Sequence, residues 1–244
     1  MSVPAKPQPE VPPALPSNPA EGISAAQGSS LTEDLALAEL KNPALSAETV
    51  EQISQDAGLM KSRKVRIALA SHPRTPRRLA LRLIRELYTF ELVKFSLSSI
   101  PPADLKRVAD NHLIAHITSM SLGERISLAR RSSQSVAAAL LLDKEHRVWQ
   151  CALENPRMTE SAVVKAAQKN TASSTFIQAV CAHAKWSVRP EIRMALLRSE
   201  HTPMAKALEF ARPLPADILR DLLHASSLPE RVKTYLLKDL ESRS

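Results

Sequence analysis

From Thr32 onward, apolar residues recur every three or four positions in short runs that are separated by polar turns. After Pro76, for example, the run consists of Leu79, Leu83 and Leu87. This spacing places apolar side chains on one face of an α-helix and leaves the opposite face polar. Helices this short are marginal on their own in water, so they depend on packing against neighbours. The pattern predicts an all-α fold made of many short, packed helices.

Residues that favour helix N-termini precede several of these runs. A hydroxyl or carboxylate side chain at such a position accepts a hydrogen bond from a backbone N–H of the first turn. A glutamate three residues after a serine completes a capping box, and proline is favoured at the first helical position. The predicted starts are Thr32, Thr75-Pro76, Ser121 with Glu124, Thr202-Pro203 and Ser227 with Glu230.

A unit of helix, proline-marked turn and second helix recurs along the chain. Asn42-Pro43, His72-Pro73 and Asn155-Pro156 each end a helix of small residues, because a residue before proline is driven out of the α region. We expect residues 32–244 to form one α-helical repeat domain, an α-solenoid in which short helix pairs stack into a superhelix. Steps of 30, 28, 31 and 24 residues separate the equivalent positions Pro43, Pro73, Pro101, Ser132 and Pro156.

The second of these units resembles the leucine-rich repeat variant (LRV) family, since it reads Val65-Arg66-Ile67-Ala68-Leu69-Ala70-Ser71-His72-Pro73-Arg74-Thr75-Pro76 with Leu79 downstream. Arg147-Val148 through Asn155-Pro156 to Thr159-Glu160 is a second match, and Asn42-Pro43 is a third. The resemblance implies a right-handed superhelix of the broad armadillo and HEAT-like kind, which is generally used for binding. The cysteine cluster of the family's iron–sulfur module has no counterpart in a chain with two cysteines.

The composition agrees with a helical fold and argues against several others. Only four glycines occur, whereas Leu and Ala dominate, so phosphate-cradling loops and hairpin-rich folds lack the residue that their turns need. No run of 18 apolar residues is present, which predicts no membrane span, and the first thirty residues do not read as a secretory signal. We expect a cytoplasmic protein in which Cys151 and Cys181 are reduced and buried.

The first 31 residues differ from the rest of the chain. Seven prolines lie among alanine, serine, glutamine and glycine, with almost no large apolar residues. Such a segment cannot bury enough apolar surface to offset its ordering entropy, so we expect a disordered tail over residues 1–31. The PxxP spacings Pro4 to Pro7 and Pro13 to Pro16 leave two readings open, a ligand for a proline-binding domain or a plain spacer.

The net charge of +8 is concentrated in one segment. Nine cations and no acid lie between Ala57 and Arg85, and without them the chain is close to neutral. Arginines spaced along a helix can bind carboxylates of an acidic protein or phosphates of a nucleic acid. In a third interpretation, Arg66 is a structural residue of the repeat and the other cations form a solvated face without a specific partner. The candidate anion- or partner-binding face consists of Lys61, Arg63, Lys64, Arg74, Arg77, Arg78, Arg82 and Arg85.

Few residues point to chemistry. His112 and His116 have a spacing that can place two imidazoles on one metal ion, but Leu113 stands where zinc proteases carry a glutamate. We therefore assign no metal, cofactor or catalytic residue. Trp149 and Trp186 either line a groove or fill the core, and core is favoured.

Three functions stay open, in decreasing order of support. The first is a non-catalytic protein-interaction scaffold whose basic face lies in the second repeat, with an acidic protein among its partners. The second is nucleic-acid binding through an arginine stripe of Arg78, Arg82 and Arg85, which share one face of the helix after Pro76. The third, a HEAT-like DNA glycosylase, rests on fold-level analogy, which is a poor guide to activity.

Overall fold

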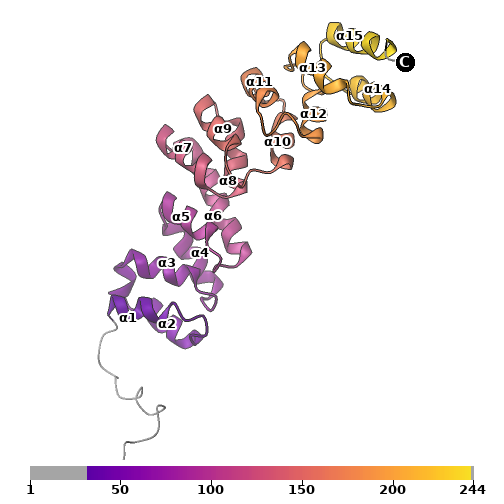
Figure 1. Ribbon diagram of the computed structural model, residues 1–244. Coiled ribbons are helices and arrows are strands. Elements are labelled where there is room, and N and C mark those ends of the chain that lie inside the picture. Colours follow the sequence, from indigo (N-terminus) through magenta and orange to yellow (C-terminus); the bar gives the residue numbers. More distant parts are fainter. Residues whose placement is uncertain (1–31, 243–244) are drawn as a thin grey trace, which may run out of the picture.

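The computed structural model describes residues 32–242. The proline-rich segment of residues 1–31 and its PxxP spacings therefore lie outside the described residues. Within the described range, all regular structure is helical, with fifteen α-helices, three short 3₁₀ helices and no strand. The all-α prediction is confirmed. The helices form an elongated row in which α1 and α15 lie at opposite ends (Figure 1).

Most helices are arranged in consecutive antiparallel pairs, as the repeat pattern indicates. In each pair we call the helix before the turn the first helix. The first helices are α1 (Glu33–Glu39), α3 (Arg63–Ser71), α5 (Thr89–Leu97), α7 (Leu122–Arg131), α9 (His146–Leu153), α11 (Ser174–Ala182) and α13 (Met204–Ala211).

The helix after the turn is the second helix of the pair. A last helix, α15 (Glu230–Glu241), follows the seventh pair. Between α-helices lie three 3₁₀ helices, η1 (Leu59–Lys61), η2 (Ile117–Ser119) and η3 (Leu140–Leu142). The second helices are α2 (Ala47–Gln55), α4 (Arg77–Glu86), α6 (Ala103–His116), α8 (Gln134–Ala139), α10 (Glu160–Ala167), α12 (Pro190–Leu196) and α14 (Ala216–His224).

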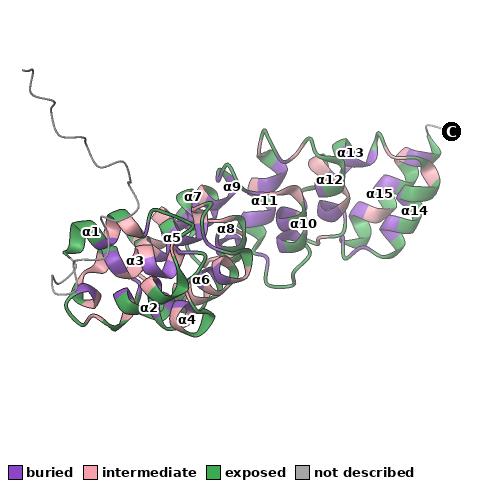
Figure 2. Cartoon of the chain, turned by 90° about the horizontal axis from the view of Figure 1, so that it is seen from below, coloured by how far each residue is buried: buried purple, intermediate pink, exposed green. Residues whose placement is uncertain are grey.

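Helices of the same kind contact each other along the row. First helices pack on first helices, as in α1 with α3 and α7 with α9, while α4 contacts α6, α6 contacts α8, and α8 contacts α10. Buried residues therefore continue from one end of the row to the other instead of gathering at one centre (Figure 2). The α-helices after α1 bury two to four residues each, whereas α1 buries Ala36 alone. Burial of a large aliphatic side chain contributes about 1.5–3 kcal/mol.

Hydrogen bonds made by side chains in the turns of several helix pairs fix the register between neighbouring pairs. The buried His72 donates a hydrogen bond from Nε2 to the carbonyl oxygen of Asn42 in the preceding turn (3.0 Å) and accepts one at Nδ1 from the backbone N–H of Arg74 (3.2 Å). His183 repeats this arrangement, with Nε2 at 2.9 Å from the carboxylate of Glu154 and Nδ1 accepting from a backbone N–H two residues on. These side chains join consecutive turns across the otherwise apolar contact.

The helix starts differ in part from the sequence prediction. The capping box of Ser121 and Glu124 is confirmed, with the Ser121 backbone N–H donating to the Glu124 carboxylate at 2.9 Å. The caps predicted at Thr75 and Thr202 are wrong, because the proline that follows each is itself the N-cap residue. Both threonine hydroxyls instead donate, at 2.6 Å, to a carbonyl near the end of the preceding helix.

Of the remaining two starts, the one predicted at Ser227 is wrong and the one at Thr32 is confirmed. Ser227 does not cap α15, because the N-cap residue there is Pro229 and the backbone N–H of Ser227 donates to the carbonyl of Arg198 at 3.0 Å. Thr32 is the N-cap residue of α1, but its side chain makes no capping hydrogen bond. Proline is the N-cap residue of five of the described α-helices, and a serine side chain caps five others.

Candidate functional site

The eight candidate cations lie on the second helix pair and the short segments next to it. Lys61 lies in η1, Arg63 and Lys64 in the first turn of α3, Arg74 in the turn after α3, and the other four in α4. Arg63 is half-buried, and the other seven are exposed. The apolar face of α4 buries Leu83 and Ile84, so the arginines occupy the face opposite the core, as the periodicity predicts.

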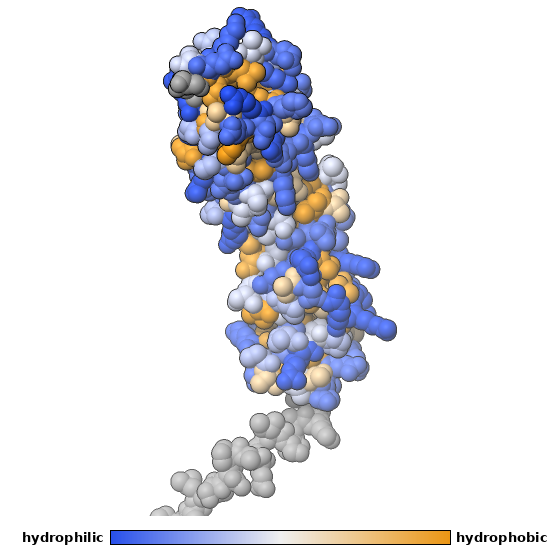
Figure 3. Space-filling model, turned by 90° about the vertical axis from the view of Figure 1, so that its right-hand side faces the viewer, coloured by the Kyte–Doolittle hydropathy of each residue, from blue (hydrophilic) through white to orange (hydrophobic). Residues whose placement is uncertain are grey.

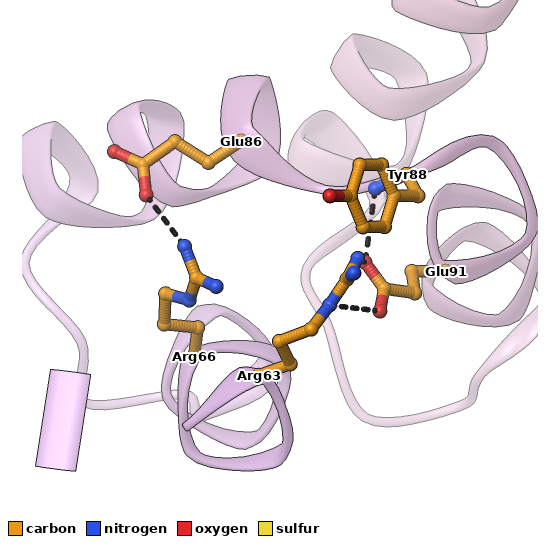
Figure 4. Close-up of polar contacts among 5 residues, drawn as sticks. All are labelled: Arg63, Arg66, Glu86, Tyr88 and Glu91. Atoms are coloured by element: carbon orange, nitrogen blue, oxygen red, sulfur yellow. Dashed lines mark hydrogen bonds and ion pairs between the residues drawn. The ribbon is translucent and has the colours of Figure 1, made fainter. Parts of the chain in front are cut away.

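Arg63 is engaged within the molecule. Its guanidinium donates two hydrogen bonds to the Glu91 carboxylate, at 3.1 and 2.9 Å, and stacks on the Tyr88 ring with 3.4 Å between the guanidinium carbon and the ring centroid (Figure 4). Partial burial by itself raises the pKa of Glu91, but the hydrogen bonds from Arg63 and from the Tyr88 backbone hold that pKa below its usual value. Arg63 thus joins α3 to α5.

Two further arginines of the segment are paired with acids that follow it in sequence. Arg66 contacts Glu86 at 3.3 Å (Figure 4), and Arg77 forms an ion pair with Asp104 at the start of α6. The folded chain therefore brings three acids from α4, α5 and α6 back onto a segment that has none of its own. The free positive charge is smaller than the sequence count indicates.

Arg78 and Arg82 have no ion-pair partner within residues 32–242 and line a groove between α2 and α4. Its volume is about 400 Å³, and Leu79 contributes an apolar wall. Glu51 of α2 is the one carboxylate in the lining. Two exposed guanidiniums beside an open groove can bind carboxylate or phosphate groups of a partner.

The charge of Arg85, the last arginine of the stripe, affects the pKa of His112, one of the two histidines of α6. Burial, together with the charges of His116 and Arg85, lowers the pKa of His112. The two imidazole rings lie 4.5 Å apart at an angle of 32°, and Nδ1 of His116 donates to the carbonyl oxygen of His112 at 2.8 Å. They border a hollow of about 290 Å³ that also contains Tyr88 and Glu124.

Within residues 32–242, His112 and His116 lack the further side chains that a metal site would need. The Glu124 carboxylate is held by the backbone N–H and the hydroxyl of Ser121 at 2.9 and 2.8 Å. Across residues 32–242, no three histidine, cysteine or acidic side chains lie close enough together to hold a metal ion. Two imidazoles alone do not complete a zinc site.

The cysteines and tryptophans are parts of the packing. Cys181 is buried, which raises the pKa of its thiol to about 11, and both cysteines are free thiols. The prediction that Cys151 is buried is wrong, because this thiol is partly exposed next to Arg130, whose side chain reaches it at 3.6 Å. The core interpretation of Trp149 and Trp186 is confirmed, since they are 4% and 2% exposed.

Trp186 shows how the core accepts a polar aromatic group. Its indole N–H donates to the carbonyl oxygen of Leu153 at 3.0 Å, at the end of α9. Trp149 packs edge-on against Phe176 of the next pair, with 5.6 Å between ring centroids. Neither ring borders one of the grooves on the second helices.

A second group of cations comes together that the sequence analysis did not single out. Lys165 and Lys169 line a groove of about 290 Å³ between α8 and α10, and Lys169 also borders a hollow of about 430 Å³ with Arg198. From Lys165 to Arg198 the sequence has six cations and one acid, Glu191, so a local excess of positive charge marks this stretch. That excess is the sequence signal by which these residues could have been found.

The face of the row that Figure 3 draws is mostly hydrophilic. Figure 3 shows one face of the row with separate apolar patches, including one at the C-terminal end. Ile218, Tyr235 and Leu237 are exposed in the last two helices. None of the described helices is both long enough and apolar enough to span a membrane.

The comparisons with known proteins return no match for this chain among protein-family models, curated proteins or solved structures.

Proposed function

We propose that this protein is a non-catalytic interaction scaffold, an α-solenoid that binds an acidic segment of a protein partner. The solenoid reading is supported by like-with-like packing of first and second helices and by the polar links between consecutive turns. The binding surface comprises Arg78 and Arg82 with the α2/α4 groove.

One observation carries this proposal. Arg63, Arg66 and Arg77 are paired with carboxylates of the chain itself, whereas Arg78 and Arg82 are exposed beside a groove and have no such partner among the described residues. Arginine binds carboxylates through two parallel hydrogen bonds, which gives both affinity and orientation. Lys61, Lys64 and Arg74 extend the positive surface without lining the groove.

Nucleic-acid binding is the second candidate, favoured by the same free arginines. It predicts a different dependence on salt, because release of condensed counterions makes duplex affinity fall steeply between about 50 and 200 mM salt. Aromatic side chains for base stacking are scarce here, since Tyr88 stacks on Arg63 and the α2/α4 groove contains none.

The test compares the wild type with R78E/R82E and with K144E/R147E, which changes the charge equally at exposed positions just before α9 and in its first turn. We expect R78E/R82E to lose at least about tenfold in affinity for fluorescent poly-glutamate, and K144E/R147E to keep it. Equal binding by all three proteins would contradict the proposal. If random-sequence duplex DNA is not retained even at about 50 mM salt, the nucleic-acid alternative is wrong.

A further inference from the structure

The groove between α8 and α10 combines an apolar floor with a positive rim. Ala138, Ala162 and Leu142 form part of the floor, and Lys165 and Lys169 stand at the edge. No acidic residue lines this groove, and neither lysine forms an ion pair within residues 32–242. Two cations beside apolar surface thus lack an internal counter-charge.

This groove occupies the same place on its helix pair as the α2/α4 groove. Arg78, Leu79 and Arg82 are the second, third and sixth residues after the N-cap residue of α4. Ser161, Ala162 and Lys165 hold the same three places after the N-cap residue of α10. Since α4, α6, α8 and α10 contact one another in order, the two grooves open on the same row of helices.

The two grooves differ at one position. Glu51 is the fifth residue after the N-cap residue of α2, and Ala138 is the fifth after that of α8. Where the first groove carries a carboxylate, the second therefore carries a methyl group. The charged residues that line the α8/α10 groove are therefore lysines alone, whereas the α2/α4 groove has both signs of charge.

The positive surface continues past Lys169 into the neighbouring hollow. Arg198 lines that hollow together with Glu200, its one carboxylate, which lies 3.6 Å from the imidazole of His201. Arg198 has no ion-pair partner among residues 32–242. A chain that leaves the α8/α10 groove along α10 therefore meets a third free cation.

We propose that the α8/α10 groove is a second docking site for an extended acidic segment of a protein partner. An apolar side chain of the segment occupies the floor, while flanking carboxylates pair with Lys165 and Lys169. The size of the groove fits one or two side chains, and no aromatic residue lines it for stacking on a base. The inference rests on the proposed scaffold function and adds the sequence character of the partner.

The experiment measures binding of the full chain to a fluorescent peptide of repeated Glu-Glu-Leu triplets. K165E/K169E reverses the rim, and A139F fills the groove from an exposed lining position without changing charge. K144E/R147E is the matched charge control. We expect the dissociation constant to rise about tenfold or more in the first two variants and less than about twofold in the control. A peptide of Glu-Glu-Ser triplets should bind more weakly, because it lacks the apolar side chain.

Circular dichroism and thermal melting establish that each variant is folded, and K165Q/K169Q replaces K165E/K169E if the latter is not. Unchanged peptide affinity in both groove variants overturns the inference, as does absence of peptide binding to the wild type. Tighter binding of duplex DNA than of the peptide, lost in the same variants, also overturns it. If R78E/R82E weakens peptide binding and the groove variants do not, the scaffold proposal stands and the second site is wrong.

Discussion

His72 and Asn155 make the same pair of hydrogen bonds in turns that are far apart in the chain. Each accepts from the backbone N–H two residues on, at 3.2 Å for His72 and 2.8 Å for Asn155. Each donates to a backbone carbonyl of the preceding turn or helix, that of Asn42 at 3.0 Å and that of Ala129 at 2.8 Å. Imidazole and carboxamide are interchangeable here because both present a donor and an acceptor with the spacing that the turn requires.

This equivalence predicts an order of stability among variants at position 72. His72→Ala leaves the Asn42 carbonyl and a backbone N–H without partners in a buried turn, which costs about 1–3 kcal/mol. His72→Asn restores both bonds and should lose less than half of that amount. Urea unfolding followed by circular dichroism measures the difference, and equal losses in the two variants would show that the ring contributes by packing alone.

The ion pair of Arg63 and Glu91 predicts a pH-dependent contribution to stability. Because the folded-state pKa of Glu91 lies below its ordinary value of 4.5, its contribution is complete above that value and is lost as the pH falls through the folded pKa. Glu91→Gln should therefore be less stable than the wild type at pH 7, by about 1 kcal/mol or less for so exposed a pair. The difference in unfolding free energy between the wild type and Glu91→Gln should disappear at acid pH.

The matched variant for Glu91→Gln is Glu86→Gln, which removes the more exposed contact with Arg66. It should cost less at neutral pH, because that pair has a single hydrogen bond of 3.3 Å. Unfolding free energies measured from neutral to acid pH decide the point. A constant difference between wild type and Glu91→Gln across this range would contradict the assignment.

For the buried Asp110 we predict the opposite dependence of stability on pH. Burial raises its pKa, one carboxylate oxygen accepts from the Ser133 hydroxyl at 2.8 Å, and the other has no hydrogen-bond partner within the described part of the chain. A raised folded-state pKa means that its contribution is fully present below the ordinary value of 3.8 and is lost as the pH rises through the folded pKa. The ionised side chain thus weakens the fold at neutral pH.

Asp110→Asn removes this charge and can keep the bond from Ser133. We expect the variant to be more stable than the wild type at pH 7, by on the order of 1 kcal/mol, with the gain vanishing in acid. Melting temperatures at neutral and acid pH measure both. A loss of stability at neutral pH would mean that the unpaired oxygen has a partner when the protein is in solution.

The two thiols should differ in reactivity. Cys181 is buried with a pKa of about 11, so it is almost entirely protonated at neutral pH, whereas Cys151 is partly exposed near Arg130. Because the thiolate is the reactive form, a thiol reagent such as Ellman's should modify Cys151 first and Cys181 only on unfolding. Cys151→Ser should abolish the fast phase, and a fast phase that survives in this variant would contradict the prediction.

Much of the fold follows from local signals in the sequence. The spacing of Leu79, Leu83 and Leu87 gives the correct apolar face of α4, because helical periodicity needs no tertiary information. His72 before Pro73 ends α3 in extended backbone, as the steric restriction before proline requires. These features depend on residues within one turn of each other, so they can be read directly.

The candidate site could be predicted only in part. Arg77 and Arg78 are indistinguishable in sequence, yet Arg77 pairs with Asp104 and Arg78 borders a groove, because the next second helix approaches one of them. Lys169 and Arg198 likewise line one hollow, although they follow the second helices of successive pairs. Which charges are neutralised depends on the contacts between pairs, and the degenerate repeat does not encode these in its spacing.

Because like helices pack on like helices, we expect the row to be elastic. Small rotations between successive helix pairs would add along the row. The sum of these rotations would bend or straighten the whole row. The separation between the α2/α4 and α8/α10 grooves is thus a variable of the protein. A segment bound in both would fix that length, so we expect a partner's affinity to depend on the stiffness of the two junctions between them, α4 with α6 and α6 with α8.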